Sequence, residues 1–453
     1  MRYKRTLFLL IIFGFLLGPS AAHSADKDET PTAAGAQSNY VGSATCARCH
    51  ANTYASLQET WHQQILRLAE DANILGNFDS QDPDLTFQRD EISWVLGGQY
   101  KQRYLTEING ALYVLPAEWN VGAEEWVAYE PDNWQSRPYS QFCAGCHTTG
   151  YDAESQTWVE PGVGCEACHG PGADHVASTG DRSKIVNPAE LQFQDQVSVC
   201  AQCHSRGEDP SGEFPFPVGY RPGGPAVFHE TFVFSTDEND FWPDGTAKRH
   251  HMQYQDWRQS VHRDSVGCIF CHTSHSKGET DHQTRMVDND RCVICHETYR
   301  NLAEHIPFMI SMIEQVNCTD CHMPQISKML QTDFQIRSHT FRPPDPALSV
   351  AYGGQEQMPN ACNLCHNDKE PEWALAVLNR QIPDADATRV PMPTSIAIPT
   401  QINALINSSE IELPAELLST EPQQDSLLPW IIGVLLLAGL PASVWIVRKV
   451  RQT

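Results

Sequence analysis

The residues of this 453-residue chain that could carry out chemistry are its cysteines, which all fall into one short pattern. The pattern is C-x-x-C-H, and its eight copies use all 16 cysteines and leave none over. In chain order, the cysteines of motifs one to eight are Cys46, Cys49, Cys143, Cys146, Cys165, Cys168, Cys200, Cys203, Cys268, Cys271, Cys292, Cys295, Cys318, Cys321, Cys362 and Cys365. The histidines that close these motifs are His50, His147, His169, His204, His272, His296, His322 and His366.

This five-residue pattern is the attachment signature of c-type heme. Two thiols three positions apart can form thioethers with the two vinyl groups of one porphyrin. The adjacent histidine then lies beneath the iron and supplies an axial nitrogen, and the axial ligand is a principal control on the reduction potential. We therefore expect eight covalently bound heme c groups, each with its iron.

Other uses of cysteine explain the pattern less well. A disulfide framework suits a secreted protein, but it gives no reason for a histidine after every second cysteine. Zinc sites pair C-x-x-C units with further cysteine or histidine ligands and do not require a histidine in the fifth position of eight motifs. A thioredoxin-type dithiol would be a single motif within a βαβ unit.

The second axial ligands are expected among the histidines outside the motifs. Of the 19 histidines, eight close the motifs and His23 lies near the N-terminus, which leaves ten. Ten histidines for eight irons favour mostly bis-histidine ligation, because neutral imidazole is a common metal ligand. Local context favours seven of them as distal ligands: His62, His175, His251, His262, His275, His305 and His339. The eighth position is left open between His229, His250, His282 and a vacancy.

The two ends of the chain predict its topology. Residues 1–25 have the basic start and short apolar run of a signal peptide. Residues 427–447 contain no charge and approach the ~20 residues needed for a transmembrane helix. Basic residues dominate the tail, residues 448–453, which the positive-inside rule places in the cytoplasm. We expect a single-pass protein of the cell membrane, with its body in the periplasm or on the outer face.

Between these ends we expect one heme domain and a linker. Residues 26–380 hold all eight motifs, and residues 381–426 read as a flexible linker. The run RYLTEI, Asn109-Gly110, ALYVLPAEW predicts a β-hairpin within a small β insertion near residues 85–130. The rest is expected to be mainly α, with short helices, much irregular coil around stacked hemes, and a short amphipathic segment at Glu372–Asn379.

Composition excludes several classes of protein. With 31 Lys+Arg against 56 Asp+Glu, the formal net charge is −25, so the chain would repel nucleic acid. The same charge would steer a basic redox partner toward it. Only two long apolar runs exist, so a polytopic transporter is excluded. Basic residues around motif five, Lys248, Arg249, His250 and Arg263, are expected to pair with heme propionates or, in an enzyme, to face a substrate.

Several longer phrases resemble the multiheme cytochromes of the cytochrome c-552/554 and doubled-CxxCH type. They are YVGSATCARCHANTYASLQETWH, VGCEACHGPGADHV, CIFCHTSHS, CTDCHMP, SHTFRPP and PNACNLCHNDKEPEWALAVL. The resemblance covers roughly Tyr40 to Leu378. It implies hemes in parallel and perpendicular stacked pairs with little regular structure around them. It also implies distal-ligand roles for His62, His175, His275 and His339.

These observations favour an electron-transfer protein over an enzyme. We expect electrons from a quinol-side donor or a periplasmic cytochrome to pass through a chain of mostly bis-histidine hemes in periplasmic or extracellular respiration. The alternative is an octaheme oxidoreductase acting on nitrite, hydroxylamine or tetrathionate at one open heme. All eight motifs end in histidine, so no motif marks a catalytic heme, and we assign no catalytic residue.

Overall fold

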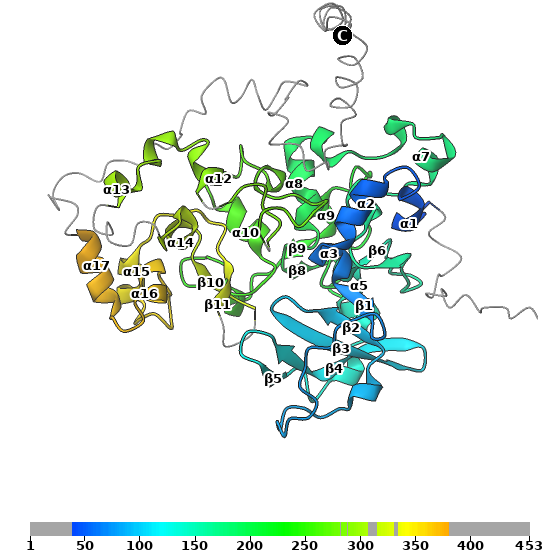
Figure 1. Ribbon diagram of the computed structural model, residues 1–453, viewed down its shortest axis with the longest axis horizontal. Helices are drawn as coiled ribbons and strands as arrows, with labels where there is room; N and C mark the ends of the chain where they lie inside the picture. The colour runs from blue at the N-terminus through cyan, green and yellow to red at the C-terminus, as the bar shows by residue number, and fades with distance from the viewer. Residues whose placement is uncertain (1–38, 281, 288, 307–314, 330–333, 380–453) are drawn as a thin grey trace, which may run out of the picture.

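The computed structural model describes residues 39–280, 282–287, 289–306, 315–329 and 334–379. Short helices and irregular segments follow one long axis, and a small antiparallel sheet lies to one side of it (Figure 1). Helices α1 (Ser43–Cys46) and α2 (Ala51–Gln58) lie toward one end of this axis, and α17 (Pro371–Asn379) lies at the other. Helix α17 confirms the amphipathic segment predicted from Glu372.

The helices of the described residues are too short to be stable alone, since isolated helices below ~12 residues are marginal in water. They must be stabilised by what packs against them, and most of them carry or flank a C-x-x-C-H motif. The others are α3 (Trp61–Gln64), α4 (Tyr139–Phe142), α5 (Ala144–His147), α6 (Cys165–His169), α7 (Ala173–Ala177), α8 (Phe193–Ala201), α9 (Phe228–Thr231), α10 (Gln253–Arg258), α11 (Cys268–Cys271), α12 (Asp290–Val293), α13 (Leu302–His305), α14 (Cys318–His322), α15 (Pro346–Ala351) and α16 (Ala361–Cys365).

One five-stranded antiparallel sheet fills the interval between motifs one and two. Its strands pair in chain order: β1 (Leu66–Leu68), β2 (Trp94–Gly97), β3 (Lys101–Ile108), β4 (Ala111–Asn120) and β5 (Glu125–Ala128).

The predicted hairpin is confirmed. Strands β3 and β4 are joined by Asn109 (φ 53°) and Gly110 (φ 81°), and a two-residue turn with both φ values positive matches the twist of the strands. The sheet begins earlier than predicted, because Leu66 of β1 pairs with Leu96 of β2.

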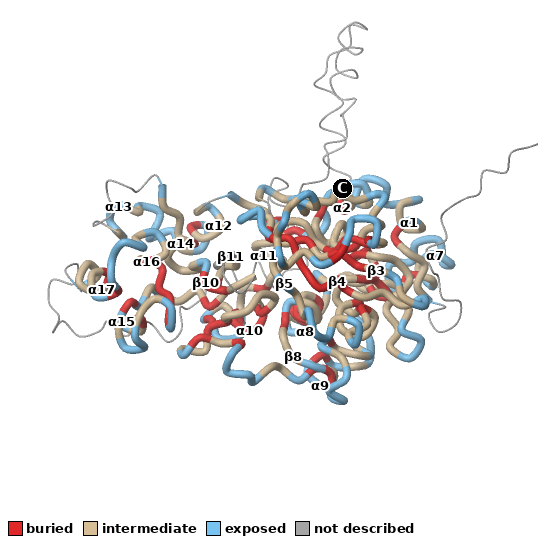
Figure 2. Tube along the Cα trace, turned by 90° about the horizontal axis from the view of Figure 1, so that it is seen from below, coloured by how far each residue is buried: buried red, intermediate tan, exposed pale blue. Residues whose placement is uncertain are grey.

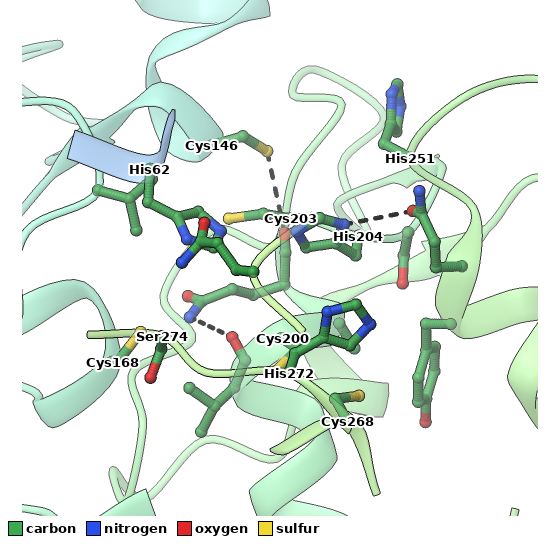
Figure 3. Close-up of a pocket in the computed structure, with 18 of the residues that line it drawn as sticks. His62, Cys146, Cys168, Cys200, Cys203, His204, His251, Cys268, His272 and Ser274 are labelled. Carbon is green, nitrogen blue, oxygen red and sulfur yellow. Dashed lines mark hydrogen bonds between the residues drawn. The ribbon is translucent and has the colours of Figure 1, made fainter. Parts of the chain in front are cut away.

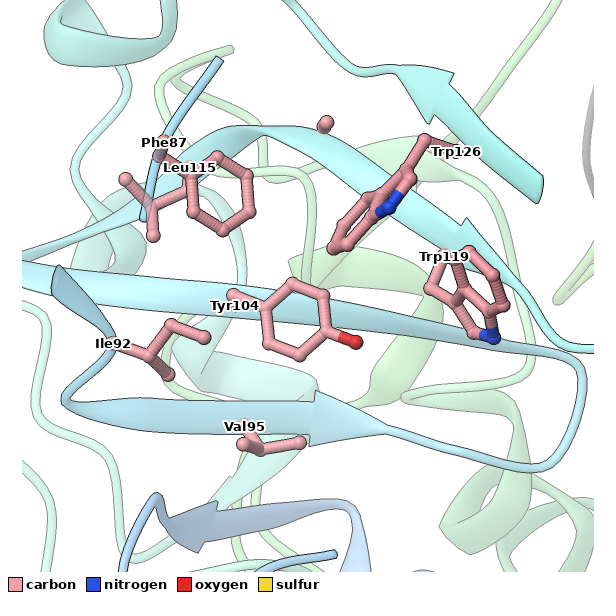
Figure 4. Close-up of a cluster of buried hydrophobic side chains, with 8 residues drawn as sticks. Phe87, Ile92, Val95, Tyr104, Leu115, Trp119 and Trp126 are labelled. Atoms are coloured by element: carbon pink, nitrogen blue, oxygen red, sulfur yellow. The ribbon is translucent and has the colours of Figure 1, made fainter. Parts of the chain in front are cut away.

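The two faces of this sheet have different partners. On one face, Tyr104 and Trp126 belong to an aromatic core that fills the space beneath the flanking loops (Figure 4). On the other face, Leu105 packs with Tyr139 and Ala144. Because Ala144 follows the first cysteine of motif two, the sheet is the support on which that motif rests. Figure 2 shows how strongly buried positions gather around β3 and β4.

Three two-stranded ladders close the loops that follow individual motifs. Strand β6 (Thr148–Thr149) follows motif two, β8 (Gly207–Glu208) follows motif four, and β10 (Gln325–Lys328) follows motif seven. Their partners are β7 (Glu160–Pro161), β9 (Val233–Phe234) and β11 (Phe334–Arg337).

The predicted signal peptide, linker, transmembrane helix and tail (residues 1–25, 381–426, 427–447 and 448–453) lie outside the described residues. Within the described ranges, no helix has the length and apolar character required to cross a membrane.

Candidate functional site

Each motif is wound into a short helical turn that orients its three functional side chains. The backbone N–H of the motif histidine donates to the backbone carbonyl of the first cysteine. This bond is 2.9 Å long from His50 to Cys46 and 3.0 Å long from His204 to Cys200. Residues three apart lie on one face of a helix, so the two thiols of a motif point the same way. All sixteen cysteines are within the described residues, and all are free thiols. Two free thiols on one face, followed by a histidine, are the donor set that heme c attachment needs.

The turns surround one very large cavity. Its volume is about 3780 Å³, and the cysteines and histidines of motifs one to seven line it. A pocket for a single cofactor usually has about 300–1,000 Å³, so this cavity has room for several. Motif eight stands outside the cavity beside motif seven, where Cys321 lies within electrostatic reach of Cys362 and Cys365.

Contacts between thiols show which motifs are neighbours. Thiols of different motifs interact in four pairs, which are Cys46 with Cys165, Cys146 with Cys203, Cys200 with Cys268, and Cys292 with Cys318. These contacts join motifs one and three, two and four, four and five, and six and seven. Figure 3 shows the middle of this series, from Cys146 through Cys203 and Cys200 to Cys268.

Weaker contacts complete the series. The Gln202 side chain of motif four donates to the Ala167 carbonyl of motif three at 3.0 Å. Cys271 of motif five interacts with Cys295 of motif six. The motifs therefore form a row in the order one, three, four, five, six, seven, eight. Motif two is attached to the side of this row at motif four.

The structure places five motif histidines opposite histidines from elsewhere in the chain, three with near-parallel ring planes and two with near-perpendicular ones. The distances between ring centres are 6.0–6.4 Å. Two imidazoles bound on opposite sides of one metal ion, with metal–nitrogen bonds of ~2 Å, have ring centres roughly 6 Å apart. The five pairs are His204 with His62, His169 with His275, His272 with His339, His296 with His262, and His322 with His305.

Burial favours the neutral form of several of these rings, which is the form that binds a metal. It lowers the pKa of His62 to about 4 and that of His339 to about 3. Nδ1 of several motif histidines is occupied by an acceptor: the Val186 carbonyl for His169 (2.7 Å) and the His282 carbonyl for His272 (2.9 Å). A bond at Nδ1 fixes the tautomer that leaves Nε2 for the iron.

Comparison with known proteins agrees with this geometry. The family model for cytochrome c554 and c-prime matches residues 122–170 and 247–323. The fold is similar to that of the outer cell wall cytochrome OcwA, at 24% identity and a TM-score of 0.62, over 76% of this chain and 86% of that one. The chain is a multiheme c-type cytochrome.

Two further solved structures align less closely with this cytochrome. They are the undecaheme cytochrome from the S-layer of Carboxydothermus ferrireducens (18% identity, TM-score 0.43, 74% of this chain and 59% of that one) and the Wolinella succinogenes octaheme sulfite reductase MccA (14% identity, TM-score 0.41, 66% and 58%).

The two other favoured distal histidines of the cytochrome line the same cavity without such a ring pair. His175 lies on α7, and its Nδ1 lies 2.9 Å from the Asp181 carbonyl oxygen. His251 adopts a left-handed backbone (φ 49°) that is uncommon for a residue other than glycine, and it contacts His250. The motif histidines not included in the five ring pairs are those of motifs one, two and eight. The ring of His366 in motif eight packs instead at a tilt against Trp373, with ring centres 4.7 Å apart.

The candidates left open from the sequence lie in three different settings. His229 sits in an aromatic cluster, with its Nε2 at 3.2 Å from the Tyr254 hydroxyl. His282 stacks on Tyr100, with ring centres 6.2 Å apart. His250 is buried beside His251, and burial holds its pKa well below the usual range.

The sequence did not reveal a group of basic residues beside motif two, which we call the basic wall. It consists of Lys101, Arg103, Arg206 and Arg249, and all four line the cavity. Lys101 and Arg103 are two apart on strand β3, so they project to the same face. The spacing of Lys101 and Arg103 was the one sign of this basic group in the sequence. Arg206 and Arg249 are distant in the chain and join the group only through the fold.

The basic residues expected around motif five are distributed differently in the structure. Arg249 belongs to the basic wall, and His250 interacts with Lys101 and Arg103 of the same wall. Lys248 lies over the Trp242 ring, 4.8 Å from its centre, and Arg263 pairs with Asp264 at the surface. These residues therefore lie in different settings, and their pairing with heme propionates stays a prediction.

Proposed function

We propose that this cytochrome binds eight heme c groups and conducts electrons along the row of seven motifs, with motif two as a side branch. The observation that carries the proposal is the unbroken series of contacts from motif one to motif eight. When bound, each heme supplies a one-electron iron couple whose potential the surrounding residues set. The residues of the row hold neighbouring attachment sites in contact, which is what a conduit requires.

The five histidine pairs support bis-histidine ligation at motifs three to seven. In this proposal His62, His262, His275, His305 and His339 are the distal ligands of those sites. His175 and His251 serve the motifs whose pairing is open, since both line the shared cavity. No bond-making step is needed, so no acid or base is assigned.

The exposed ends of the row are the sites where we expect partners to dock. Cys49 and His50 of motif one are exposed, and so is Cys365 of motif eight. Most of the middle motifs have partly buried thiols behind which the hemes would lie. Together with the sequence of the C-terminus, this supports a protein tethered to the cell membrane that exchanges electrons with a quinol-side donor or a periplasmic cytochrome.

Interrupting the row at one motif tests the conduit directly. The Cys268→Ala, Cys271→Ala double variant removes the attachment site of motif five, and Cys143→Ala, Cys146→Ala removes that of the side branch. Each loses one heme, which makes them matched controls. We expect the motif-five variant to lose electron transfer between a donor and an acceptor bound at opposite ends, and the motif-two variant to keep it. Equal rates in both would contradict the proposed row.

A second candidate function is an oxidoreductase with one open heme that acts on a small nitrogen or sulfur compound. It is favoured by the three motif histidines, His50, His147 and His366, that are not among the five ring pairs. Electron paramagnetic resonance of the oxidised cytochrome, titrated with nitrite, hydroxylamine and cyanide, separates the two functions. Eight low-spin hemes that ignore all three compounds support the conduit, whereas a high-spin heme that binds one of them supports the enzyme.

A further inference from the structure

Motif two differs from motifs three, four, five and seven in the bonding of its histidine. Nδ1 of His147 is buried and has no hydrogen-bond partner among the described residues. By contrast, His169 and His272 meet carbonyl oxygens at 2.7 and 2.9 Å, and His204 meets Oε1 of Gln253 at 3.3 Å.

This difference affects the iron that the histidine would hold. An acceptor at Nδ1 makes the imidazole a stronger donor and stabilises the ferric state, which lowers the reduction potential. His147 lacks that assistance, so its site favours the ferrous state relative to the others.

The basic wall acts in the same direction. Lys101 and Arg103 share a single carboxylate, Glu118, and Arg206 and Arg249 share another, Asp240. Each carboxylate is therefore shared by two basic side chains. Burial lowers the pKa of Lys101 to about 7, so the first group carries a net positive charge only while Lys101 is protonated. Ferric heme carries one more positive charge than ferrous heme, so nearby cations raise the potential.

The cations of the wall also lie close to the motif. Lys101 and Arg103 are the charged residues that act on His147, and both lower its pKa, although burial is the largest cause of that shift. Nε of Arg206 and of Arg249 lie 3.8 and 3.6 Å from the shared Asp240 oxygen, and neither forms a hydrogen bond. Nε of each guanidinium group therefore lacks a direct hydrogen bond, and Asp237 is a second carboxylate that acts on both groups.

The opposite charge stands at motifs one and three. Glu166 is fully buried and accepts backbone N–H bonds from Gly42 (2.8 Å) and Gly172 (2.7 Å), and no cation in the described part of the chain forms an ion pair with it. Glu160 accepts from the Ser43 hydroxyl at 2.7 Å. Both carboxylates act on Cys46 of motif one. Negative charge stabilises the ferric state, so these two sites are set to lower potentials.

We infer that the heme at motif two has the highest reduction potential of the array, so that electrons from the end of motifs one and three collect on this side branch. The inference rests on the proposed conduit, since it concerns the order of potentials among its sites. It assigns Arg206, Arg249, Lys101 and Arg103 as residues that tune this site, and it gives the upstream part of the row a direction, from motif one through motifs three and four to motif two.

A reductive titration of the full eight-heme chain, followed by visible absorbance, tests this order. Arg249→Gln removes one cation of the wall, and Asp240→Asn removes the anion that it shares with Arg206. We expect Arg249→Gln to make the first-reduced heme harder to reduce, by about tenfold in its oxidised-to-reduced ratio at fixed potential. For one electron, tenfold corresponds to 59 mV. Asp240→Asn should shift the same heme in the opposite direction, which mere structural damage would not do.

Two further variants complete the test. Lys277→Gln removes an exposed cation that pairs with Glu59 and is not part of this wall, and it should leave the first step unchanged. The Cys143→Ala, Cys146→Ala variant should lose the first step altogether. The inference is overturned if the lost step is a later one, or if Arg249→Gln and Asp240→Asn shift the first step the same way. Failure of the conduit would instead appear in the motif-five exchange experiment, which does not depend on the order of potentials.

Discussion

At the scale of single residues, the histidine ring pairs depend most on the fold, because they join residues that are distant in the chain. His62 follows motif one in the chain, yet its ring faces His204 of motif four. We predict that His62→Ala leaves one of the eight hemes without a second imidazole, so that one-eighth of the low-spin signal becomes high-spin in electron paramagnetic resonance.

His229→Ala is the matched control for that substitution. This histidine interacts with Tyr254 inside an aromatic cluster and forms no ring pair with a motif histidine among the described residues, so all hemes should stay low-spin. High-spin signal in His229→Ala, or none in His62→Ala, would refute the assignment of the pair.

Buried imidazoles also make stability depend on pH. An unfolded histidine takes up a proton near pH 6.5, whereas burial lowers the pKa of His62 and His147 to about 4. Between these values the unfolded chain binds more protons, so the stabilisation is complete above about pH 6.5 and is lost as the pH falls toward 4.

We expect each buried imidazole to cost on the order of 1–3 kcal/mol of unfolding free energy as the pH falls through that window. Urea midpoints measured at about pH 7 and about pH 5 check this effect, and iron ligation would add to it with the same sign. A midpoint that does not move with pH would contradict the prediction.

Local sequence patterns name candidate residues for heme attachment and ligation, whereas the contacts between these residues depend on the fold. A C-x-x-C-H turn needs nothing beyond five residues, so every attachment site could be named. The choice of distal histidines came from local context, and five of them face motif histidines. Their pairing could not be derived, because His262 faces His296 of motif six and not the adjacent motif five.

At the scale of elements, two glycines with similar backbone conformations have different surroundings. One lies in an open turn, and the other lies against a neighbouring segment. Gly110 in the β3–β4 turn and Gly162 after β7 have φ of 81° and 78°. A side chain at Gly110 would meet nothing within 4 Å, whereas one at Gly162 would overlap the Gln63 carbonyl, beside His62.

We predict that Gly110→Ala and Gly162→Ala each lose ~1 kcal/mol of stability from the left-handed backbone. Only Gly162→Ala should also displace His62, because Val163 N–H donates to the His62 carbonyl at 2.9 Å. Thermal unfolding measures the first effect, and the high-spin fraction measures the second. A normal spin state in Gly162→Ala would show that the segment can shift without moving the ligand.

Elements with their own sequence signal were predictable, and those formed by tertiary contact were not. The dipeptide Asn109-Gly110 predicts the hairpin. The alternation of side chains along the flanking strand places Tyr104 and Leu105 on opposite faces of the sheet. Strand β1 is only three residues long and exists because β2 is present to pair with it. The ladder of β6 and β7 involves two residues on each side, too few for any periodicity to appear.

At the scale of the whole molecule, the fold is organised around the contacts between motifs. Hydrophobic clusters lie at the sheet and beneath motifs four and eight, and the central cavity separates them. The side chains alone therefore leave the middle of the molecule open, and eight porphyrins would supply the missing apolar contacts. A sequence shows how many such groups are needed, but their order in space follows from the completed fold.

The net charge of −25 should govern how fast the cytochrome meets its partners. Electrostatic steering raises association rates with an oppositely charged partner and falls as salt screens the field, with a Debye length of ~8 Å near physiological ionic strength. We predict that electron exchange with a basic cytochrome slows at least several-fold as salt rises from low to physiological concentration. The rate of reduction by an uncharged small reductant should not change over the same salt range, because the field of the protein exerts no net force on an uncharged molecule. Stopped-flow rates for both reactions decide the matter: if the basic partner is equally insensitive to salt, docking depends on contacts at the exposed ends of the row and not on the overall field.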